Sequence, residues 1–322
     1  FPYTTLFRST VTLQAEGNVA VGSILSGSAN GNGGNVTLTS TNGSVTAIST
    51  GTLTSSSGVS ETRSVGGIVT GTAGSDQGGT ITITAPGDIR TGWLLTGSPS
   101  GTVVSSSLSS VNGGGNVTLT SRSGSIDTTI NVTDLDAGLL KDLGLTSAQA
   151  ALASQAGGEL GLILTGSQDG NGGTVDLSAA GDIRTGAIVS GSLNATGGKV
   201  ALTSSSGSID TSNDALFTGL TRETWLAGAA AAGLEPTDTI DFAEDLGFGS
   251  GTYTVDQLAT ILDGFSFRPG IITGSEGGTG AEVTLTAAGD ITTSNIITSS
   301  LSGNSGKIDI RSSGGSINGQ EG

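Results

Sequence analysis

The sequence predicts an all-β fold in which one chain winds through about eight stacked coils, a parallel β-solenoid. The first observation is a repeat: an apolar-x-apolar triplet followed by Gly, one small polar residue, and Ile or Val. The triplets start at Val11, Val36, Ile81, Val117, Val175, Val200, Val283 and Ile308. The second observation is the step from each triplet to its Ile or Val partner, which alternates between 8 and 9 residues. Repeats at this scale are typical of stacked architectures, and the alternation indicates a two-coil unit present four times.

The uninterrupted coil over 175–199 shows how one rung is built. Val175 and Leu177 alternate with polar residues, so both point to the same side of a strand. A turn through Gly181 precedes a second short strand at 183–185, and a third is expected at 186–190. Because stacked strands lie about 4.8 Å apart, equivalent side chains form apolar columns that bury what a single coil cannot.

The composition excludes several functional classes. Gly is abundant, with 57 residues, and aromatic residues make up 3%, yet the apolar residues recur with period two, which predicts strands. The net charge of −16 opposes binding to nucleic-acid phosphates or to an anionic membrane surface. Cys is absent, and no apolar run approaches the roughly 18 residues of a membrane-spanning helix.

The coils differ in length because insertions interrupt them. The three longest occur in nine-step coils and rejoin the repeat at 67–69, 162–164 and 271–273. Those at about 128–160 and 212–268 contain helix-capping patterns, such as the one at 146–149, so we predict that both are partly helical. Nine-step coils are two rungs, about 9.6 Å, apart, close to the usual distance between packed helices. We therefore expect the two inserts to pack together as a lobe on one side of the rod.

Aromatic residues concentrate in the last insert rather than in the repeats. Trp225, Tyr253 and Phe265 are the predicted contact residues for a ligand or partner. The competing interpretation places the same three side chains in the core of the lobe.

The residue types exclude much catalytic chemistry. With no His and no Cys, the chain has no His-based triad, no Cys nucleophile and no His-ligated metal. Asp88, Asp182 and Asp290 recur at one corner of the coil, and we interpret them as turn-capping residues. The segment 134–138 resembles the start of a calcium loop but lacks its later ligands. We predict no catalytic, cofactor or metal-binding residues.

Outward Thr pairs on the first strand are a further candidate feature. They occur at Thr37 and Thr39, Thr82 and Thr84, Thr118 and Thr120, and Thr284 and Thr286. Flat arrays of this kind occur on ice-binding solenoids, although Thr also suits exposed strand faces in general. The pattern is interrupted in other coils by Asp176, Ala201, Asp309 and Arg311.

The repeated segments resemble a known family. Two repeated segments carry the resemblance: Gly-Gly-Asn-Val-Thr-Leu-Thr-Ser at 33–40 and 114–121, and Ala-Ala-Gly-Asp-Ile at 179–183 and 287–291. They resemble filamentous-haemagglutinin-like exoproteins, in particular the large cyanobacterial members of that family. The resemblance covers roughly 10–127, 161–211 and 269–322. It implies a right-handed β-helix, two-partner secretion through an outer-membrane transporter, a secreted or cell-surface location and an adhesive role. The implied partner is a cell-surface glycan or protein receptor.

Two expectations concern the ends of the chain. The family's amino-terminal secretion domain is not found in these residues, so we expect an interior segment of a longer exoprotein. Residues 1–9 resemble the translation of a sequencing adapter, and we expect them to be an artefact outside the single solenoid domain over 10–322.

These observations predict a structural, adhesive and non-catalytic segment of a large surface exoprotein. The alternative is a carbohydrate-active β-helix enzyme of the polysaccharide lyase or hydrolase type. That alternative requires a groove with two or more carboxylates within about 10 Å. A lesser alternative is an ice-binding solenoid.

Overall fold

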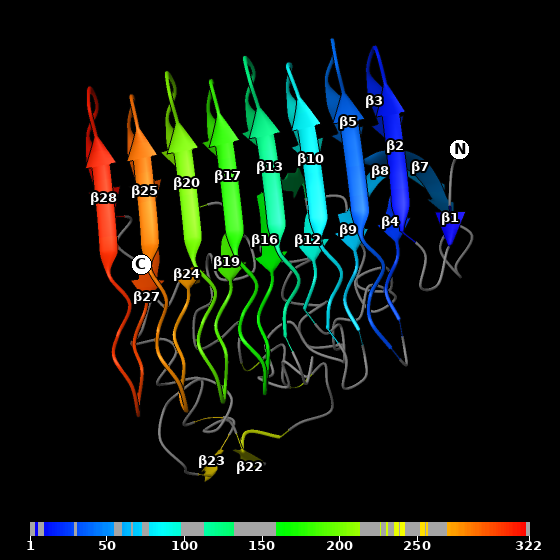
Figure 1. The fold of residues 1–322 in the computed structure, drawn as a ribbon. Coiled ribbons are helices and arrows are strands. Elements are labelled where there is room, and N and C mark those ends of the chain that lie inside the picture. The colour runs from blue at the N-terminus through cyan, green and yellow to red at the C-terminus, as the bar shows by residue number, and fades with distance from the viewer. Residues whose placement is uncertain are drawn as a thin grey trace.

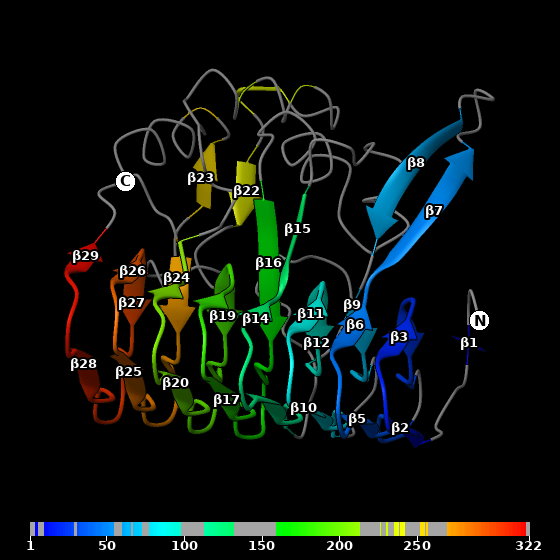
Figure 2. The ribbon, with the colours of Figure 1, turned by 90° about the horizontal axis from the view of Figure 1, so that it is seen from above.

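The computed structural model describes residues 4–5, 10–28, 31–54, 60–65, 67–72, 77–97, 113–131, 159–212, 226, 230, 235–237, 239–241, 252–254, 256 and 269–319. They form a right-handed parallel β-solenoid whose rungs follow one another along the rod (Figures 1 and 2). The predicted fold class is confirmed. Successive rungs contribute their strands to three parallel sheets, here called sheets I, II and III.

Sheets I and II each contain eight strands, one from every rung. Sheet I consists of β2 (Val11–Ala15), β5 (Val36–Ser40), β10 (Ile81–Ala85), β13 (Val117–Ser121), β17 (Val175–Ala179), β20 (Val200–Ser204), β25 (Val283–Ala287) and β28 (Ile308–Ser312). Sheet II consists of β3 (Val19–Val21), β6 (Val45–Ala47), β11 (Ile89–Thr91), β14 (Ile126–Asp127), β18 (Ile183–Arg184), β21 (Ile209–Asp210), β26 (Ile291–Thr293) and β29 (Ile317–Gly319).

Sheet III contains the third strand of each of the first seven rungs and one additional strand at its start. In spatial order it consists of β1 (Thr4–Thr5), β4 (Ile24–Leu25), β9 (Gly67–Val69), β12 (Trp93–Leu95), β16 (Glu159–Leu164), β19 (Ala187–Val189), β24 (Pro269–Ile272) and β27 (Asn295–Ile297). β1 pairs in parallel with β4, so Thr4 and Thr5, within the nonapeptide expected to lie outside the solenoid, extend this sheet.

The core consists of columns of equivalent apolar side chains, as the repeat predicts. Register is kept from rung to rung: Leu119, for example, lies beside Ile83 on one side and Leu177 on the other, and all three are fully buried. The columns of sheets II and III are formed by residues such as Ile183 and Ile188, with exposures of 1% and 0%. Burial of these columns is the main apolar contribution to stability.

The alternation of eight and nine residues has a structural basis at the corner between sheets I and II. Eight-step coils end their first strand with Ala, whereas nine-step coils end it with Ser. The Ser204 hydroxyl donates to the Gly181 carbonyl of the preceding rung at 2.7 Å and accepts the N–H of Gly207 at 3.0 Å. Ser40, Ser121 and Ser312 make the same pair of bonds. Each nine-step corner is therefore bonded by a side chain to the eight-step coil before it.

The three longest insertions leave the rod between sheets II and III, at the predicted position. The first is an antiparallel hairpin of β7 (Ser49–Thr54) and β8 (Ser60–Val65) that projects from the rod (Figure 2). The second begins with β15 (Thr129–Asn131), which pairs antiparallel with β16. The third contains an antiparallel pair of β22 (Thr239–Asp241) and β23 (Thr252–Thr254). The described parts of the inserts are thus mainly extended, and most residues of the two predicted partly helical inserts, 128–160 and 212–268, fall outside the described residues.

Two insertions share a local turn where the chain leaves sheet II. Asp127 Oδ1 accepts hydrogen bonds from the backbone N–H and the hydroxyl of Thr129, at 2.9 and 2.7 Å. Asp210 Oδ1 accepts the same pair from Ser212, at 2.9 and 2.6 Å. Local carboxylate bonds of this kind compete with strand pairing, which accounts for an exit from the rung directly after each Asp.

Candidate functional site

The structure brings none of the three predicted contact residues together in a described site. Tyr253 lies in β23, where its backbone pairs with Ile240 of β22. Trp225 and Phe265 lie outside the described residues. Their grouping as ligand contacts stays a prediction, and so does the helical lobe in which they were placed.

The recurring corner acids join neighbouring rungs instead of capping their own turns. Asp182 Oδ1 accepts the N–H of Ser208 in the next rung at 2.8 Å, and Ser208 Oγ accepts the N–H of Asp290 one rung further on at 3.0 Å. The same alternation continues along the whole rod through Asn18, Ser44, Asp88, Ser125 and Ser316. The interpretation as local turn caps is therefore corrected: these carboxylates have a structural role between rungs.

The outward face of sheet II carries a short ladder of alternating charge. Arg90, Asp127, Arg184 and Asp210 occupy equivalent positions of consecutive rungs. The Arg90 Nε and Asp127 Oδ2 atoms are 3.8 Å apart, and the Arg90 side chain is 64% exposed. Exposed pairs of this kind contribute little to stability, so the ladder adds little to the stability of the rod.

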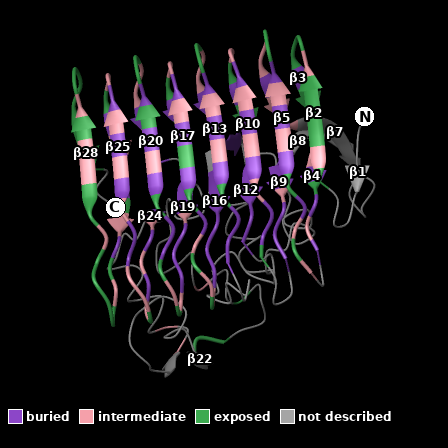
Figure 3. Ribbon diagram, in the orientation of Figure 1, coloured by how far each residue is buried: buried purple, intermediate pink, exposed green. Residues whose placement is uncertain are grey.

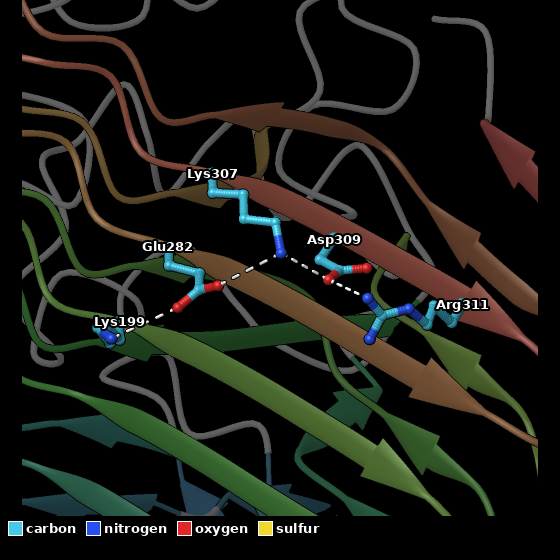
Figure 4. A network of polar contacts seen from close by, with 5 residues as sticks. All are labelled: Lys199, Glu282, Lys307, Asp309 and Arg311. Carbon is cyan, nitrogen blue, oxygen red and sulfur yellow. Dashed lines mark hydrogen bonds and ion pairs between the residues drawn. The ribbon is translucent and has the colours of Figure 1, made fainter.

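A larger charged network occupies the outward face of sheet I over its last three rungs (Figure 4). Lys199 Nζ lies 3.4 Å from Glu282 Oε2, and Lys307 Nζ lies 4.0 Å from Glu282 Oε1. Asp309 Oδ2 accepts from Lys307 Nζ at 2.8 Å and from Arg311 Nη2 at 2.6 Å. The network places three basic side chains on one face of a protein with a net charge of −16.

Asp309 is the central acid of this network. The hydrogen bond from Lys307 holds the pKa of the Asp309 carboxyl below its usual range, and the positive charge of Arg311 acts in the same direction against partial desolvation. The carboxylate therefore stays ionised and fixes Arg311 in place. Arg311 keeps 67% of its side chain exposed and is available to a ligand.

Beside Arg311 the surface forms a shallow groove of about 390 Å³ at the carboxyl ends of three neighbouring strands. The lining residues are Thr203, Ser204, Ser205, Thr286, Ala287, Ala288, Arg311, Ser312 and Ser313. Hydroxyl and guanidinium groups can donate hydrogen bonds to sugar hydroxyls or carboxylates. No described carboxylate lines the groove, so it lacks the paired acids that glycoside hydrolysis requires.

The outward Thr pairs stand in register over three consecutive rungs. Thr37, Thr82 and Thr118 form one column, and Thr39, Thr84 and Thr120 form the other. All six are half-buried. The next rungs interrupt the columns with Asp176, Ser178 and Ala201.

Sheet III differs from the other two sheets in its outward face. Leu95 and Leu164 point away from the core but are only 8% exposed, and Trp93 is 6% exposed. The indole N–H of Trp93 has no hydrogen-bond partner among the described residues. Around these three residues the outward face is apolar and buried, in contrast to the Thr and charged residues outside sheets I and II.

The described residues also bear on metal binding and on membrane insertion. They contain no group of three or more His, Cys, Asp or Glu side chains arranged to hold a metal ion. Among the same residues, no helix has the length and apolar character needed to cross a membrane.

Sequence reasoning missed the groove and its network. The sequence did contain a signal for the charged network, which was the interruption of the Thr pattern. In the last rung, Asp309 and Arg311 stand where other rungs have the two outward Thr residues. Together with Lys307 they give an alternating +, −, + pattern at every second residue, which places all three charges on one face of a strand.

The described fold defines the protein as a parallel β-solenoid with decorated rungs. Comparison with protein-family models, with curated proteins and with solved structures finds no match to this chain.

Proposed function

We propose that the protein is a non-catalytic structural and adhesive rod belonging to a secreted surface exoprotein. The observation that carries the proposal is the in-register stack of eight rungs, from which the long insertions leave at a single corner. Such a stack holds its insertions in a row along one side, and in repeat proteins insertions on one face often form the binding face.

The proposed partner is a cell-surface glycan or a protein receptor. Two surfaces support it: the insert at 212–268, with its aromatic residues, and the groove beside Arg311. Aromatic side chains and Arg are the residues that most often dominate binding energy at interfaces. Trp225, Tyr253 and Phe265 remain the proposed anchors within the insert.

The proposed location is the cell surface, after export through an outer-membrane transporter. This part of the proposal rests on the resemblance of the repeats at 33–40 and 114–121 to filamentous-haemagglutinin-like exoproteins. The absence of Cys is compatible with export, because the rod is held together by its core and its ladders without disulfides.

A binding experiment with matched deletions tests the adhesive role. Deleting 213–269 leaves the same spacing from Ile209 to Ile271 as the uninterrupted rung has from Ile183 to Ile188. Deleting 49–66 restores the equivalent spacing from Val45 to Ile68 and serves as the control. The intact chain, both deletions and Arg311→Ala are applied to a glycan array and to immobilised cell-surface protein.

The proposal expects binding by the intact chain and by the 49–66 deletion, with loss in the 213–269 deletion, in Arg311→Ala, or in both. Equal binding by all four proteins would show that neither the last insert nor Arg311 contacts the partner. If the intact chain binds neither class of partner, the adhesive role is contradicted and only the role of a structural scaffold remains.

A second candidate function rests on the two Thr columns of sheet I. Neighbouring Thr residues lie about 4.8 Å apart between rungs and about 7 Å apart within a rung, a regular hydroxyl array able to order water. Ice binding predicts thermal hysteresis at micromolar protein that Thr84→Lys abolishes. Freezing and melting temperatures that coincide for the intact chain would eliminate this candidate.

A further inference from the structure

Asn-Gly pairs are the places where a chain most readily loses a side-chain amide, because Gly has no side chain to keep its backbone nitrogen away from the Asn carbonyl. Four such pairs lie among the described residues, at Asn32, Asn42, Asn171 and Asn318. Asn318 belongs to the last rung, whereas each of the other three has a described rung after it. The surroundings of these three residues differ, and the difference determines which of them reacts.

Asn32 and Asn171 are each held by the rung that follows. Asn32 Oδ1 accepts the N–H of Gln77 at 3.0 Å, and the N–H of the following Gly donates to the Gln77 carbonyl at 3.0 Å. Asn171 Oδ1 accepts the N–H of Thr196 at 3.2 Å, and the N–H of the following Gly donates to the Thr196 carbonyl at 2.9 Å. In both pairs, the side chain and the nitrogen that would attack it are therefore fixed by a neighbouring rung.

Asn42 lies in the turn between β5 and β6 and is not held in this way. Figure 3 shows β5 as buried or half-buried along its length, whereas Asn42 is exposed. No described residue forms a hydrogen bond with the Asn42 side chain. The N–H of Gly43 donates at 2.8 Å to the hydroxyl of Ser40, which belongs to the same turn. Neither reacting group of this pair is bonded to another rung.

The equivalent turns of two other nine-step coils have an additional bond. Ser123 and Ser206 stand where this turn has Asn42. The Ser123 hydroxyl donates to the Pro86 carbonyl of the preceding rung at 2.6 Å, and Ser206 bonds to Ala180 in the same way. With Asn in place of Ser, the side chain is left free in the turn.

The rung that follows Asn42 also lacks a donor at this turn. At the equivalent junction further along the rod, the N–H of Ala180 donates to the Ser121 carbonyl of the preceding rung at 3.1 Å. Pro86 stands at the position of Ala180 in the rung after Asn42, and proline has no backbone N–H. The turn that holds Asn42 therefore lacks this bond to the next rung.

We propose that Asn42 is a site of spontaneous deamidation in the folded protein. The Gly43 nitrogen attacks Cγ of Asn42 and loses its proton to solvent. An N–Cγ bond forms and the Cγ–Nδ2 bond breaks, so that the amide takes a proton from solvent and leaves as ammonia. Water then opens the resulting cyclic imide at either carbonyl carbon, which gives aspartate or isoaspartate. Water reaches this turn because Asn42 is exposed.

The isoaspartate product changes the turn. It carries the main chain through the former side chain and so adds one backbone atom before Gly43. Two bonds follow directly after that point, from the Gly43 N–H to Ser40 Oγ at 2.8 Å and from the Ser44 N–H to Asn18 Oδ1 at 2.9 Å. With a longer backbone the two donors no longer fit these positions together. Modification of Asn42 therefore loosens the corner that joins the first two rungs.

Mass spectrometry of the intact chain tests the proposal. The protein is incubated in neutral buffer, folded in one sample and unfolded in guanidinium chloride in the other, and peptide mapping measures conversion at Asn32, Asn42 and Asn171. In the unfolded chain the three are expected to react at similar rates, because each precedes Gly. In the folded chain Asn42 is expected to react about tenfold faster than the other two, whose additional hydrogen bonds to a neighbouring rung must open first.

Three variants connect the reaction to the bonds of this turn. Asn42→Ser introduces the residue of the two equivalent turns and is expected to abolish conversion here without changing the far-ultraviolet circular dichroism. Ser40→Ala removes the acceptor of the Gly43 N–H and is expected to raise the rate at Asn42 several-fold. Ser204→Ala is the matched control, because it removes the same hydroxyl from another nine-step turn and is expected to leave the rate at Asn42 unchanged.

Two results would overturn the proposal. The first is a folded chain in which Asn42 converts no faster than Asn32 and Asn171. The second is a rate at Asn42 that Ser40→Ala does not raise, or that Ser204→Ala raises equally, because the reaction would then not depend on the bonds of this turn.

Discussion

The Asp88 carboxylate accepts the backbone N–H of Ser125 from the next rung at 2.8 Å. This bond is one link in a ladder that alternates between acidic or amide side chains and Ser hydroxyls at one corner of the rod. Each link satisfies a backbone donor that the turn leaves without a strand partner, and such unsatisfied donors are unfavourable. The ladder therefore links neighbouring rungs where the sheets themselves are interrupted.

Replacing one acid of the ladder tests this role. Asp182→Ala removes the acceptor for the Ser208 N–H and is expected to lower the free energy of unfolding by about 1 kcal/mol. Asp182→Asn is the matched control, because Asn18 makes the same bond to the Ser44 N–H at 2.9 Å. Urea denaturation measures both. Equal destabilisation by Ala and Asn would mean that the charge matters rather than the acceptor.

The charged network predicts a dependence of stability on pH. The pKa of Asp309 is lowered in the folded protein, first by the hydrogen bond from Lys307. A lowered folded pKa gives a stabilisation that is complete above the unfolded value, about 3.9, and is lost as the pH falls through the folded value. Asp309→Asn is therefore expected to lower the urea midpoint at pH 6 more than at pH 2.5.

Asp176→Asn is the control for that comparison. Asp176 also lies outward on sheet I and is exposed, but it forms no ion pair within the part of the chain that the structure describes. If Asp309→Asn and Asp176→Asn change the midpoint equally at both pH values, the network does not stabilise the last rungs.

Much of the rod can be predicted from the sequence because the same apolar pattern and the same turn residues recur in every rung. The triplet at Val175 and Leu177 predicts inward columns, and the spacing predicts the parallel register, since a one-residue slip would turn every apolar side chain outward. The corner bonds of Asp182 and Ser208 could not be predicted as such, because a turn-forming Asp has the same sequence whether it bonds within its own turn or to the next rung. The groove beside Arg311 depends on three strands that are far apart in sequence, and its position follows only once they are stacked.

The inserts mark the limit of sequence reasoning. The inserts do not contain the repeated sequence pattern. Without a repeat, the sequence gives no spacing from which contacts between their segments could be predicted. Asp127 and Asp210, which turn the chain out of the rung, were visible as a repeated Ile-Asp-Thr motif. The bonds to Thr129 and Ser212 give that motif its structural meaning.

Deleting one insert tests whether the two largest inserts pack together. Removing 213–269 is expected to increase the fluorescence of a dye that binds apolar surface, because the insert at 128–160 would lose its partner. The deletion of 49–66 is the control and is expected to leave dye binding unchanged. If the dye responds equally to the two deletions, or if neither deletion changes it, the inserts do not form a shared lobe.

Glycines at the corner between sheets III and I predict the largest effect of a single methyl group. A Cβ on Gly114 would overlap the carbonyl oxygen of Thr165, and the Thr165 hydroxyl already donates to the Gly173 carbonyl at 2.8 Å. The neighbouring rung is held by strands on both sides of this corner and cannot move away. Gly114→Ala is therefore expected to lower the free energy of unfolding by about 3 kcal/mol.

Gly17→Ala provides the matched control, because a Cβ there has no atom within 4 Å and the change is expected to stay within about 0.5 kcal/mol. Urea denaturation of both variants, followed by far-ultraviolet circular dichroism, measures the difference. A Gly114→Ala variant as stable as Gly17→Ala would show that the rungs at this corner can separate by the width of a methyl group. The close approach of Gly114 to Thr165 would then not be required for stacking, and the regular spacing of the coils would depend on the core columns alone.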